Sequence, residues 1–314
     1  MPEGAPFYAT RALAAPCENG PVNAPAAPAP TRVETLAFLC LLAGGCAIAL
    51  SPIFVRLSDT GPVASAFWRT GLAVPILWVW VLRSEPGPAR ISSRALAGAG
   101  IFFACDLGVW HWSITYTSVA NSTLLANLAP IFVTLAGWFL YRRRVTRTFL
   151  IGMFAAIAGM FILVGPNFSI GGTRLAGDAL GALTAVFYAG YMLTIKTARD
   201  AGTSTARLMA WSTTITAAAL LPVALLSPQP MLPQGSQGWL ILAGLALVSQ
   251  VLGQGLIAYA FAHLPASLSS VSLLIQPVMA AIFAWALFGE AIGAAQFVGG
   301  SVVLAGIWLA KRGS

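Results

Sequence analysis

Charge is what this chain has least of. Lys, Arg, Asp and Glu together make up only 8% of its 314 residues, whereas hydrophobic residues make up 58%. Soluble domains carry about a quarter charged residues, so the composition indicates a membrane protein. The net charge of +8 does not indicate nucleic-acid binding, because the basic residues lie in short segments between apolar runs, where membrane topology explains them.

Residues that hold metals or catalyse reactions are also scarce. The four cysteines show no CxxC spacing and are expected to be small packing residues. The two histidines, His111 and His263, have no nearby ligand set, so we expect neither a metal nor another cofactor. The absence of GxxxxGK[ST], HExxH and GxSxG motifs argues against a Walker-type ATPase and common hydrolases. We therefore expect that the chain is not an enzyme.

Long apolar stretches fill the chain after an Ala/Pro-rich start at 1–33, which we expect to be a disordered cytoplasmic tail. A membrane-spanning helix needs about 20 apolar residues, and short loops separate ten such stretches. They are 35–57, 62–82, 93–115, 118–141, 147–165, 174–196, 206–226, 237–260, 267–288 and 293–310.

An internal repeat with a spacing of 147 residues relates the two halves of this apolar region. The matched pairs need no gap between them. They are Gly108 with Gly255, Trp112 with Tyr259, Pro130 with Pro277, Trp138 with Trp285, Gly152 with Gly299, and Gly159 with Gly306. Duplicated membrane domains are typical of secondary transporters.

The distribution of Arg and Lys predicts the orientation. With the N-terminus in the cytoplasm, 14 of these residues fall on the cytoplasmic side, and only Arg56 and Arg174 fall on the other. Ten spans divide into five and five, and an odd number per copy makes the second copy start from the opposite side. We therefore predict an all-α integral membrane protein of the inner (plasma) membrane. Its ten transmembrane helices form two inverted five-helix repeats, 34–166 and 167–312, and both termini are cytoplasmic.

The second copy carries a motif that resembles a known family. Pro277 is followed by Leu287–Glu290 (LFGE), then by Gln296 and Gly299–Gly300, and the second span contains Phe67-Trp68-Arg69. With the ten spans and the repeat, these residues resemble the drug/metabolite transporter superfamily in its EamA-type ten-helix branch. Within it, the chain is similar to amino-acid exporters, including the aromatic amino-acid type. The resemblance implies export of small metabolites by alternating access, without ATP.

Two ionisable residues lie well inside predicted spans, where charge is costly and commonly functional. Asp106 shares a helix face with Phe103 and Trp110, so we expect Asp106 and Trp110 to contact substrate; the alternative is an Asp that only ties helices together. Arg69 could bind a carboxylate, but its place in the resembled motif favours a structural buried charge.

Helix kinks are predicted where proline removes a backbone hydrogen bond. Pro130 and Pro277 occupy matching positions, and Ser51-Pro52 marks another kink and a candidate gate. Asn127 lies three residues before Pro130, and Gln276 directly precedes Pro277. We expect both side chains to contact substrate, although a kink repaired by neighbouring serines is the alternative.

Four further polar residues are candidates for a substrate cavity. Tyr188 and Tyr191 are spaced i,i+3 and suit the binding of ring-shaped groups, or else interhelical packing. Gln250 and Gln254 are spaced i,i+4, and amides are penalised in lipid, so both are expected to face protein or a cavity.

We predict a secondary transporter that exports amino acids or related metabolites. The expected partners are a small-molecule substrate and the lipid bilayer, with no nucleic acid, and the monomer is expected to function alone. The main alternative is a proton-coupled exporter of multiple drugs or cationic compounds, since a lone membrane carboxylate among aromatics also suits that task. A passive channel or a membrane enzyme has no support among the motifs.

Overall fold

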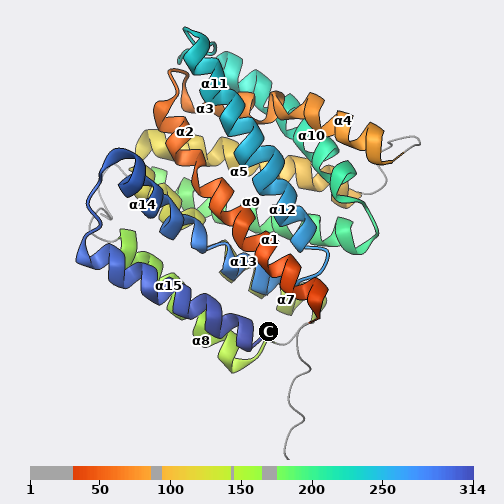
Figure 1. Cartoon of the computed structure of the whole chain (residues 1–314), viewed down its shortest axis with the longest axis vertical. Coiled ribbons are helices and arrows are strands. Elements are labelled where there is room, and N and C mark those ends of the chain that lie inside the picture. The colour runs from red at the N-terminus through yellow and green to blue at the C-terminus, as the bar shows by residue number, and fades with distance from the viewer. Residues whose placement is uncertain (1–30, 86–93, 143–144, 165–174) are drawn as a thin grey trace, which may run out of the picture. The chain divides into compact units, whose positions relative to one another are not determined.

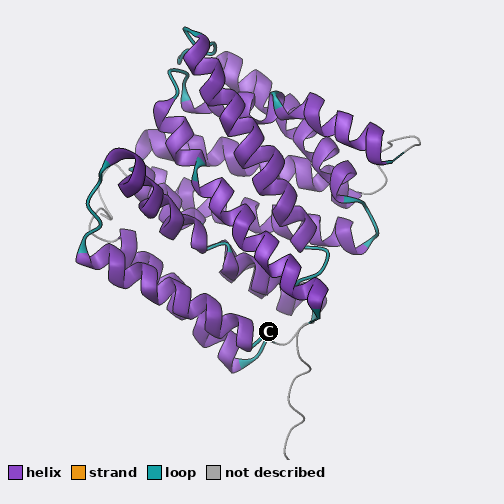
Figure 2. Cartoon of the chain, in the orientation of Figure 1, coloured by secondary structure: helices purple, strands orange, loops and turns teal. Residues whose placement is uncertain are grey.

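The computed structural model describes residues 31–85, 94–142, 145–164 and 175–314, and every regular element in these ranges is a helix (Figure 2). The predicted tail at 1–33 falls almost wholly outside these ranges. Within the described ranges, ten helical stretches are long and apolar enough to cross a membrane, as predicted. They are Arg32–Leu57, Pro62–Ser84, Arg94–Tyr116, Asn121–Leu140, Arg147–Val164, Leu175–Asp200, Thr205–Leu226, Ser236–Ala260, Ala266–Phe288 and Ala294–Arg312, numbered below as spans 1 to 10.

Five spans are uninterrupted or nearly uninterrupted α-helices. They are α5 (Arg94–Tyr116), α8 (Arg147–Val164), α9 (Leu175–Asp200), α10 (Thr205–Leu226) and α15 (Ala294–Arg312). The other five are divided. They comprise α1 (Arg32–Ala49) with α2 (Ser51–Leu57), α3 (Pro62–Gly71) with α4 (Ala73–Ser84), α6 (Val119–Ala126) with α7 (Ala129–Tyr141), α11 (Ser236–Gly244) with the π-helix η3 (Leu245–Gly253) and α12 (Gln254–Ala260), and α13 (Ala266–Ser272) with α14 (Ile275–Phe288).

Proline lies just after the break in four of the divided spans. Pro52, Pro130 and Pro277 follow the breaks in spans 1, 4 and 9. The break in span 2, between α3 and α4, was not predicted. Pro75 explains it, because proline has no backbone N–H to donate to the carbonyl one turn earlier.

The helix ends form two faces of the helical region. One face carries the start of α1 and the end of α15, and we call it the terminal face. Near it, the Lys311 ammonium lies 3.9 Å from the centre of the Phe38 ring. On the opposite face, the Arg56 guanidinium pairs with Glu290 at 2.5 Å, and the Gly61 N–H donates to the Pro230 carbonyl at 3.0 Å. The connections after spans 1, 7 and 9 therefore meet on the opposite face, as alternating membrane crossings require.

Spans 5 and 10 pack against each other through glycines that the repeat relates. α8 and α15 lie side by side at one edge of the bundle (Figure 1). A Cβ atom built on Gly159 would lie 2.6 Å from the Val303 nitrogen, and one on Gly306 would lie 2.7 Å from the Gly152 carbonyl oxygen. The absence of side chains at these positions lets the two backbones approach closely, a packing mode common between membrane helices.

The remaining spans surround a shared interior. α5 packs closely against α9 and α10: a Cβ on Gly190 would meet the Phe102 ring, and one on Gly100 would meet Ile215 and the Ser212 carbonyl. This interior is not uniformly apolar, because buried polar side chains recur on α3, α5, α10 and η3. Polar groups inside a membrane protein face other protein groups or a cavity, so these side chains are expected to surround a cavity or to pair with one another.

Candidate functional site

A cavity of about 170 Å³ lies among spans 1, 2, 3, 4, 6, 8 and 9. We call it the main cavity. It is more than ten times larger than the roughly 10–15 Å³ that one water molecule requires. Its lining residues lie mostly in the halves of these spans that are nearer to the opposite face. Those with polar or ionisable side chains are Ser51, Arg69, Asp106, Trp110, His111, Thr123, Asn127, Thr184, Tyr188, Gln254 and Gln276.

Arg69 presents an unpaired donor in this cavity. The residue is 7% exposed, its Nε donates to the Gln250 Oε1 at 3.0 Å, and its Nη1 donates to the Ser51 Oγ at 3.4 Å. Nη2 is buried and has no hydrogen-bond partner in the part of the chain that the structure describes. A buried, unpaired guanidinium nitrogen is costly, and a carboxylate is the group that matches it best. Arg69 therefore joins helices together and also lines the cavity.

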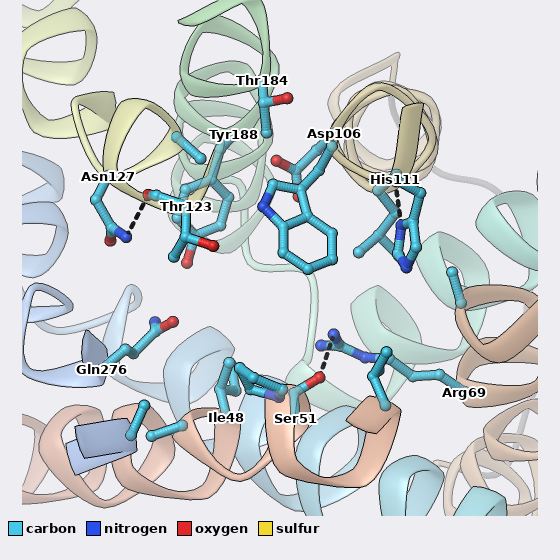
Figure 3. Close-up of a pocket in the computed structure, with 18 of the residues that line it drawn as sticks. Ile48, Ser51, Arg69, Asp106, His111, Thr123, Asn127, Thr184, Tyr188 and Gln276 are labelled. Atoms are coloured by element: carbon cyan, nitrogen blue, oxygen red, sulfur yellow. Dashed lines mark hydrogen bonds between the residues drawn. The ribbon is translucent and has the colours of Figure 1, made fainter. Parts of the chain in front are cut away.

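Asp106 supplies the opposite charge. Its side chain is 8% exposed and lines the main cavity from α5, and Figure 3 shows it on the wall opposite Arg69 and Ser51. Among the described residues, neither a hydrogen bond nor an ion pair to its carboxylate is found, and it does not pair with Arg69. The cavity is thus lined by one basic and one acidic side chain that do not contact each other directly.

His111 lies on the same wall as Asp106 (Figure 3). Its Nδ1 lies 2.6 Å from the Leu107 carbonyl oxygen, and a carbonyl can only accept, so Nδ1 carries the proton. The Nε2 of the neutral ring is then an acceptor, and it is buried without a partner within the described ranges. Asp106 and His111 together offer acceptors to a positively charged donor such as an ammonium group.

Asn127 and Gln276 approach the cavity from the breaks in spans 4 and 9, on facing walls (Figure 3). Asn127 follows the last residue of α6, and its amide donates to the Thr123 carbonyl at 2.8 Å. Gln276 lies in the first turn of α14, beside Pro277, which also lines the cavity. The two repeats therefore place one amide each beside equivalent helix breaks.

Aromatic rings form a stack along one side of the cavity. Tyr191 stacks on Phe103 with ring centres 4.5 Å apart and on Tyr188 with ring centres 6.3 Å apart. Phe103 and Tyr188 line the cavity, as does Trp110, so the wall combines apolar area with one phenol hydroxyl. Such a wall suits the apolar part of a small amphipathic molecule.

Three of the residues predicted to contact substrate or form a kink do not line the main cavity. Tyr191 is 1% exposed, and its hydroxyl donates to the Gln254 Oε1 at 3.2 Å. Gln250 is also 1% exposed; it accepts from Arg69, and its Nε2 donates to the Thr213 Oγ1 at 3.1 Å. Both lie one layer behind the lining. Pro130 lies in the first turn of α7, beyond the break.

Sequence reasoning did not select several lining residues. His111 was considered only as a metal ligand, and no feature of the sequence shows that its ring is fixed by the Leu107 carbonyl. Thr123 and Thr184 were missed because isolated threonines are common in membrane helices. The spacing from Asp106 to Trp110, by contrast, places both on one face of α5, and both line the cavity.

A second cavity of about 80 Å³ lies near the terminal face, between spans 4, 6 and the start of span 9. It is lined by Thr134, Gly137, Lys196 and Ser267, among others. The same three spans line the main cavity at 123–127, 184–188 and 276–280. The helix breaks of spans 4 and 9 therefore lie between the two cavities along both spans.

The side chains of the main cavity do not form a metal site. Among the residues that the structure describes, no three His, Cys, Asp or Glu side chains gather closely enough to hold an ion. The chemistry that the cavity can supply is recognition: a donor for a carboxylate, acceptors for an ammonium, amides and aromatic surface.

Comparison with known proteins agrees with this architecture. The EamA-like transporter family matches residues 35–165 and 175–312, one match for each half. A solved crystal structure superposes with a TM-score of 0.74 over 88% of this chain and 96% of the other, at 16% sequence identity, which shows a shared fold.

Three relatives of known sequence illustrate the range of the family. An uncharacterized transporter of Archaeoglobus fulgidus is 26% identical over 88% of this chain and 98% of its own. The pseudopaline exporter of Pseudomonas aeruginosa is 24% identical over 85% of this chain and 92% of its own. A probable terminal-alkyne amino-acid exporter of Streptantibioticus cattleyicolor is 26% identical over 73% of this chain and 75% of its own. With two family matches that together cover most of its length, and with ten helices able to span a membrane among its described residues, the chain belongs to the EamA-like transporter family.

Proposed function

We propose that the protein is a secondary exporter of amino acids and related zwitterionic metabolites. The observation that carries this proposal is that one basic and one acidic side chain, Arg69 and Asp106, line the main cavity without pairing with each other. Arg69 offers its Nη2 to a carboxylate, and Asp106, with the acceptor Nε2 of His111, offers a place for an ammonium. A zwitterion satisfies both charges at once, which lowers the cost of keeping them inside the membrane.

The names of two relatives support export of small molecules, in one case of an amino acid. One is named as a pseudopaline exporter, and another is named as a probable exporter of a terminal-alkyne amino acid. The proposed location is the inner (plasma) membrane. Many Arg and Lys residues follow the even-numbered spans, and by the positive-inside rule both termini then lie in the cytoplasm. Export then moves the substrate from the terminal face to the opposite face.

Alternating access between the halves 34–166 and 167–312 would give this movement. The main cavity and the second cavity mark the two ends of one path along spans 4, 6 and 9. The paired helix breaks lie between them and act as the barrier that moves. Both cavities are lined by the helices of a single chain, so the proposal needs no second copy and the monomer is sufficient for transport.

Filling the second cavity tests this path. Gly137 lines that cavity, and a Cβ built on it meets nothing within 4 Å, so the backbone can carry a side chain there, and Gly137→Leu puts a leucine side chain at the wall of the cavity. We expect amino-acid binding to purified protein to stay within about twofold of wild type, while the transport rate falls by about tenfold or more. Gly137→Ala is the matched control and should transport at nearly the wild-type rate. Wild-type transport by Gly137→Leu would contradict the proposed path.

The function itself is tested by transport in proteoliposomes. Labelled amino acids are offered with and without a pH gradient, and counterflow against unlabelled amino acids is measured. We expect saturable uptake that an unlabelled amino acid inside the vesicle accelerates, because the carrier then returns to the outside loaded with substrate instead of empty. If no amino acid crosses faster than in protein-free liposomes, the proposal is wrong. Saturable counterflow also excludes a passive pore.

Export of lipophilic cations is an alternative function that the same cavity supports less well. Asp106 beside Phe103 and Trp110 would attract a cation. Arg69, however, lines the same cavity with an unpaired nitrogen, and a second positive charge there repels a monovalent cation that lacks a carboxylate. The arrangement of charges therefore favours a zwitterion.

A further inference from the structure

Span 8 contains a π-helix that its counterpart in the first repeat lacks. The π-helix η3 covers Leu245–Gly253, and the positions 147 residues earlier, 98–106, lie within the continuous α-helix α5. π-Helical turns are rare and occur frequently at functional sites. The two repeats therefore differ in backbone structure at the level of the main cavity, where α5 contributes Asp106 and η3 contributes Leu245 to the lining.

Gln250, in this π-helix, connects three spans. Its Oε1 accepts from the Arg69 Nε at 3.0 Å, and its Nε2 donates to the Thr213 Oγ1 of α10 at 3.1 Å. Both ends of the amide are thus used, and the side chain is 1% exposed. The amide cannot turn over without losing one of the two bonds.

These bonds determine where Arg69 points. A guanidinium is planar and rigid, so fixing Nε–H and Nη1 also fixes the direction of Nη2. Gln250 holds Nε, and Ser51 of α2 holds Nη1 at 3.4 Å, while the Phe103 ring lies 5.7 Å below the guanidinium carbon. Nη2 is the guanidinium nitrogen left without a partner among the described residues, and Arg69 lines the main cavity.

We propose that Gln250, in the π-helix of span 8, is a positioning residue for substrate recognition. Its hydrogen bond with the Arg69 Nε orients the Arg69 Nη2 toward the substrate carboxylate. This inference rests on the proposed function, since it requires a carboxylate-bearing substrate in the main cavity. Gln250 does not contact the substrate. It acts on the carboxylate only by orienting Arg69, so removing the Gln250 amide affects recognition of the carboxylate alone.

The test compares an amino acid with its methyl ester, which keeps the ammonium but lacks the carboxylate charge. L-phenylalanine, L-leucine and their methyl esters are titrated into purified wild type and Gln250→Leu by calorimetry. We expect the variant to bind the free acids about tenfold more weakly and the esters with unchanged affinity, because only the acids use Arg69. In proteoliposomes the KM for the acid rises while the maximal rate is preserved.

Two milder substitutions on α10 complete the test: Thr213→Val is a second test variant, and Thr214→Val is its matched control. Thr213→Val removes the partner of the Gln250 Nε2 but keeps its bond to Arg69, and we expect a smaller, acid-specific loss of affinity. Thr214→Val removes a different interhelical bond, the one donated by the Trp78 Nε1 at 3.0 Å, and should change neither affinity. These variants also serve if Gln250→Leu fails to fold.

The outcomes separate this inference from the function on which it rests. If wild type binds acids better than esters and Gln250→Leu and Thr213→Val keep the same preference, the positioning role is wrong and the function stands. If both affinities fall equally, Gln250 is only a structural residue and the inference is also wrong. If wild type binds neither acids nor esters, both the proposed function and the inference fail.

Discussion

Gly159→Ala is expected to destabilise the protein by about 3 kcal/mol or more, although it adds a single methyl group. The new Cβ would lie 2.6 Å from the Val303 nitrogen and 2.8 Å from the Gly299 carbonyl oxygen. Both are backbone atoms, so no side chain can rotate away and α15 must move as a whole. The midpoint of thermal unfolding and the monodisperse fraction of purified protein measure the effect.

Gly255→Ala is the matched control for this substitution. Gly255 is also buried in a helix, α12, but a Cβ built on it meets nothing within 4 Å. Alanine exceeds glycine in helix propensity by about 1 kcal/mol, so this variant should melt at or above the wild-type temperature. Equal melting temperatures for Gly159→Ala and Gly255→Ala would show that the close contact of α8 and α15 is not what holds these spans together.

Asp106→Asn is expected to lower the efficiency of amino-acid transport by about 10- to 100-fold. A hydrogen bond to a charged group contributes about 1.5–3 kcal/mol, and the asparagine amide cannot offer an ammonium the same ionic contact. The side chain keeps its size, so the cavity and the fold should be preserved. Initial rates of labelled amino-acid counterflow in proteoliposomes measure the change, with thermal unfolding as the check on folding.

Asp178→Asn is the control, because Asp178 is buried to the same degree but lies outside the lining of the main cavity. Its Oδ1 accepts from the Thr117 Oγ1 at 2.7 Å and the Asn121 Nδ2 at 3.2 Å, which ties α9 to the start of span 4. We expect its loss to affect stability more than substrate affinity. Wild-type transport by Asp106→Asn would remove Asp106 from recognition, and selective loss of lipophilic-cation efflux would favour the alternative exporter.

The number and extent of the spans could be predicted because long apolar runs and short polar loops leave few alternatives. The third span, for example, was expected at 93–115 and is Arg94–Tyr116. The break beside Pro75 was missed: kinks were predicted only at Pro52, Pro130 and Pro277, although Pro75 lacks a backbone N–H in the same way. The π-helix at Leu245–Gly253 was missed because no residue type marks it.

The candidate site was predictable only where helical spacing brings residues together. Asp106 and Trp110 share one turn of α5, and both line the main cavity. Arg69 was expected to be structural, yet it also lines the cavity, because three separate helices determine which of its nitrogens stays unpaired. Gln250 and Tyr191 were expected at the cavity because of their polar side chains and their helical spacing from Gln254 and Tyr188. Their hydrogen bonds place them behind it, and such long-range pairs cannot be read from one sequence.

The most direct test of the central claim removes the two charges of the substrate one at a time. L-phenylalanine, its methyl ester and N-acetyl-phenylalanine are titrated into wild type, Arg69→Gln and Asp106→Asn. If Arg69 binds the carboxylate and Asp106 binds the ammonium, Arg69→Gln weakens binding of the free and acetylated acids but not of the ester. Asp106→Asn weakens the free acid and the ester but not the acetylated acid. Equal losses for all three ligands in both variants, or no loss in either, would contradict recognition of a zwitterion by this pair of residues.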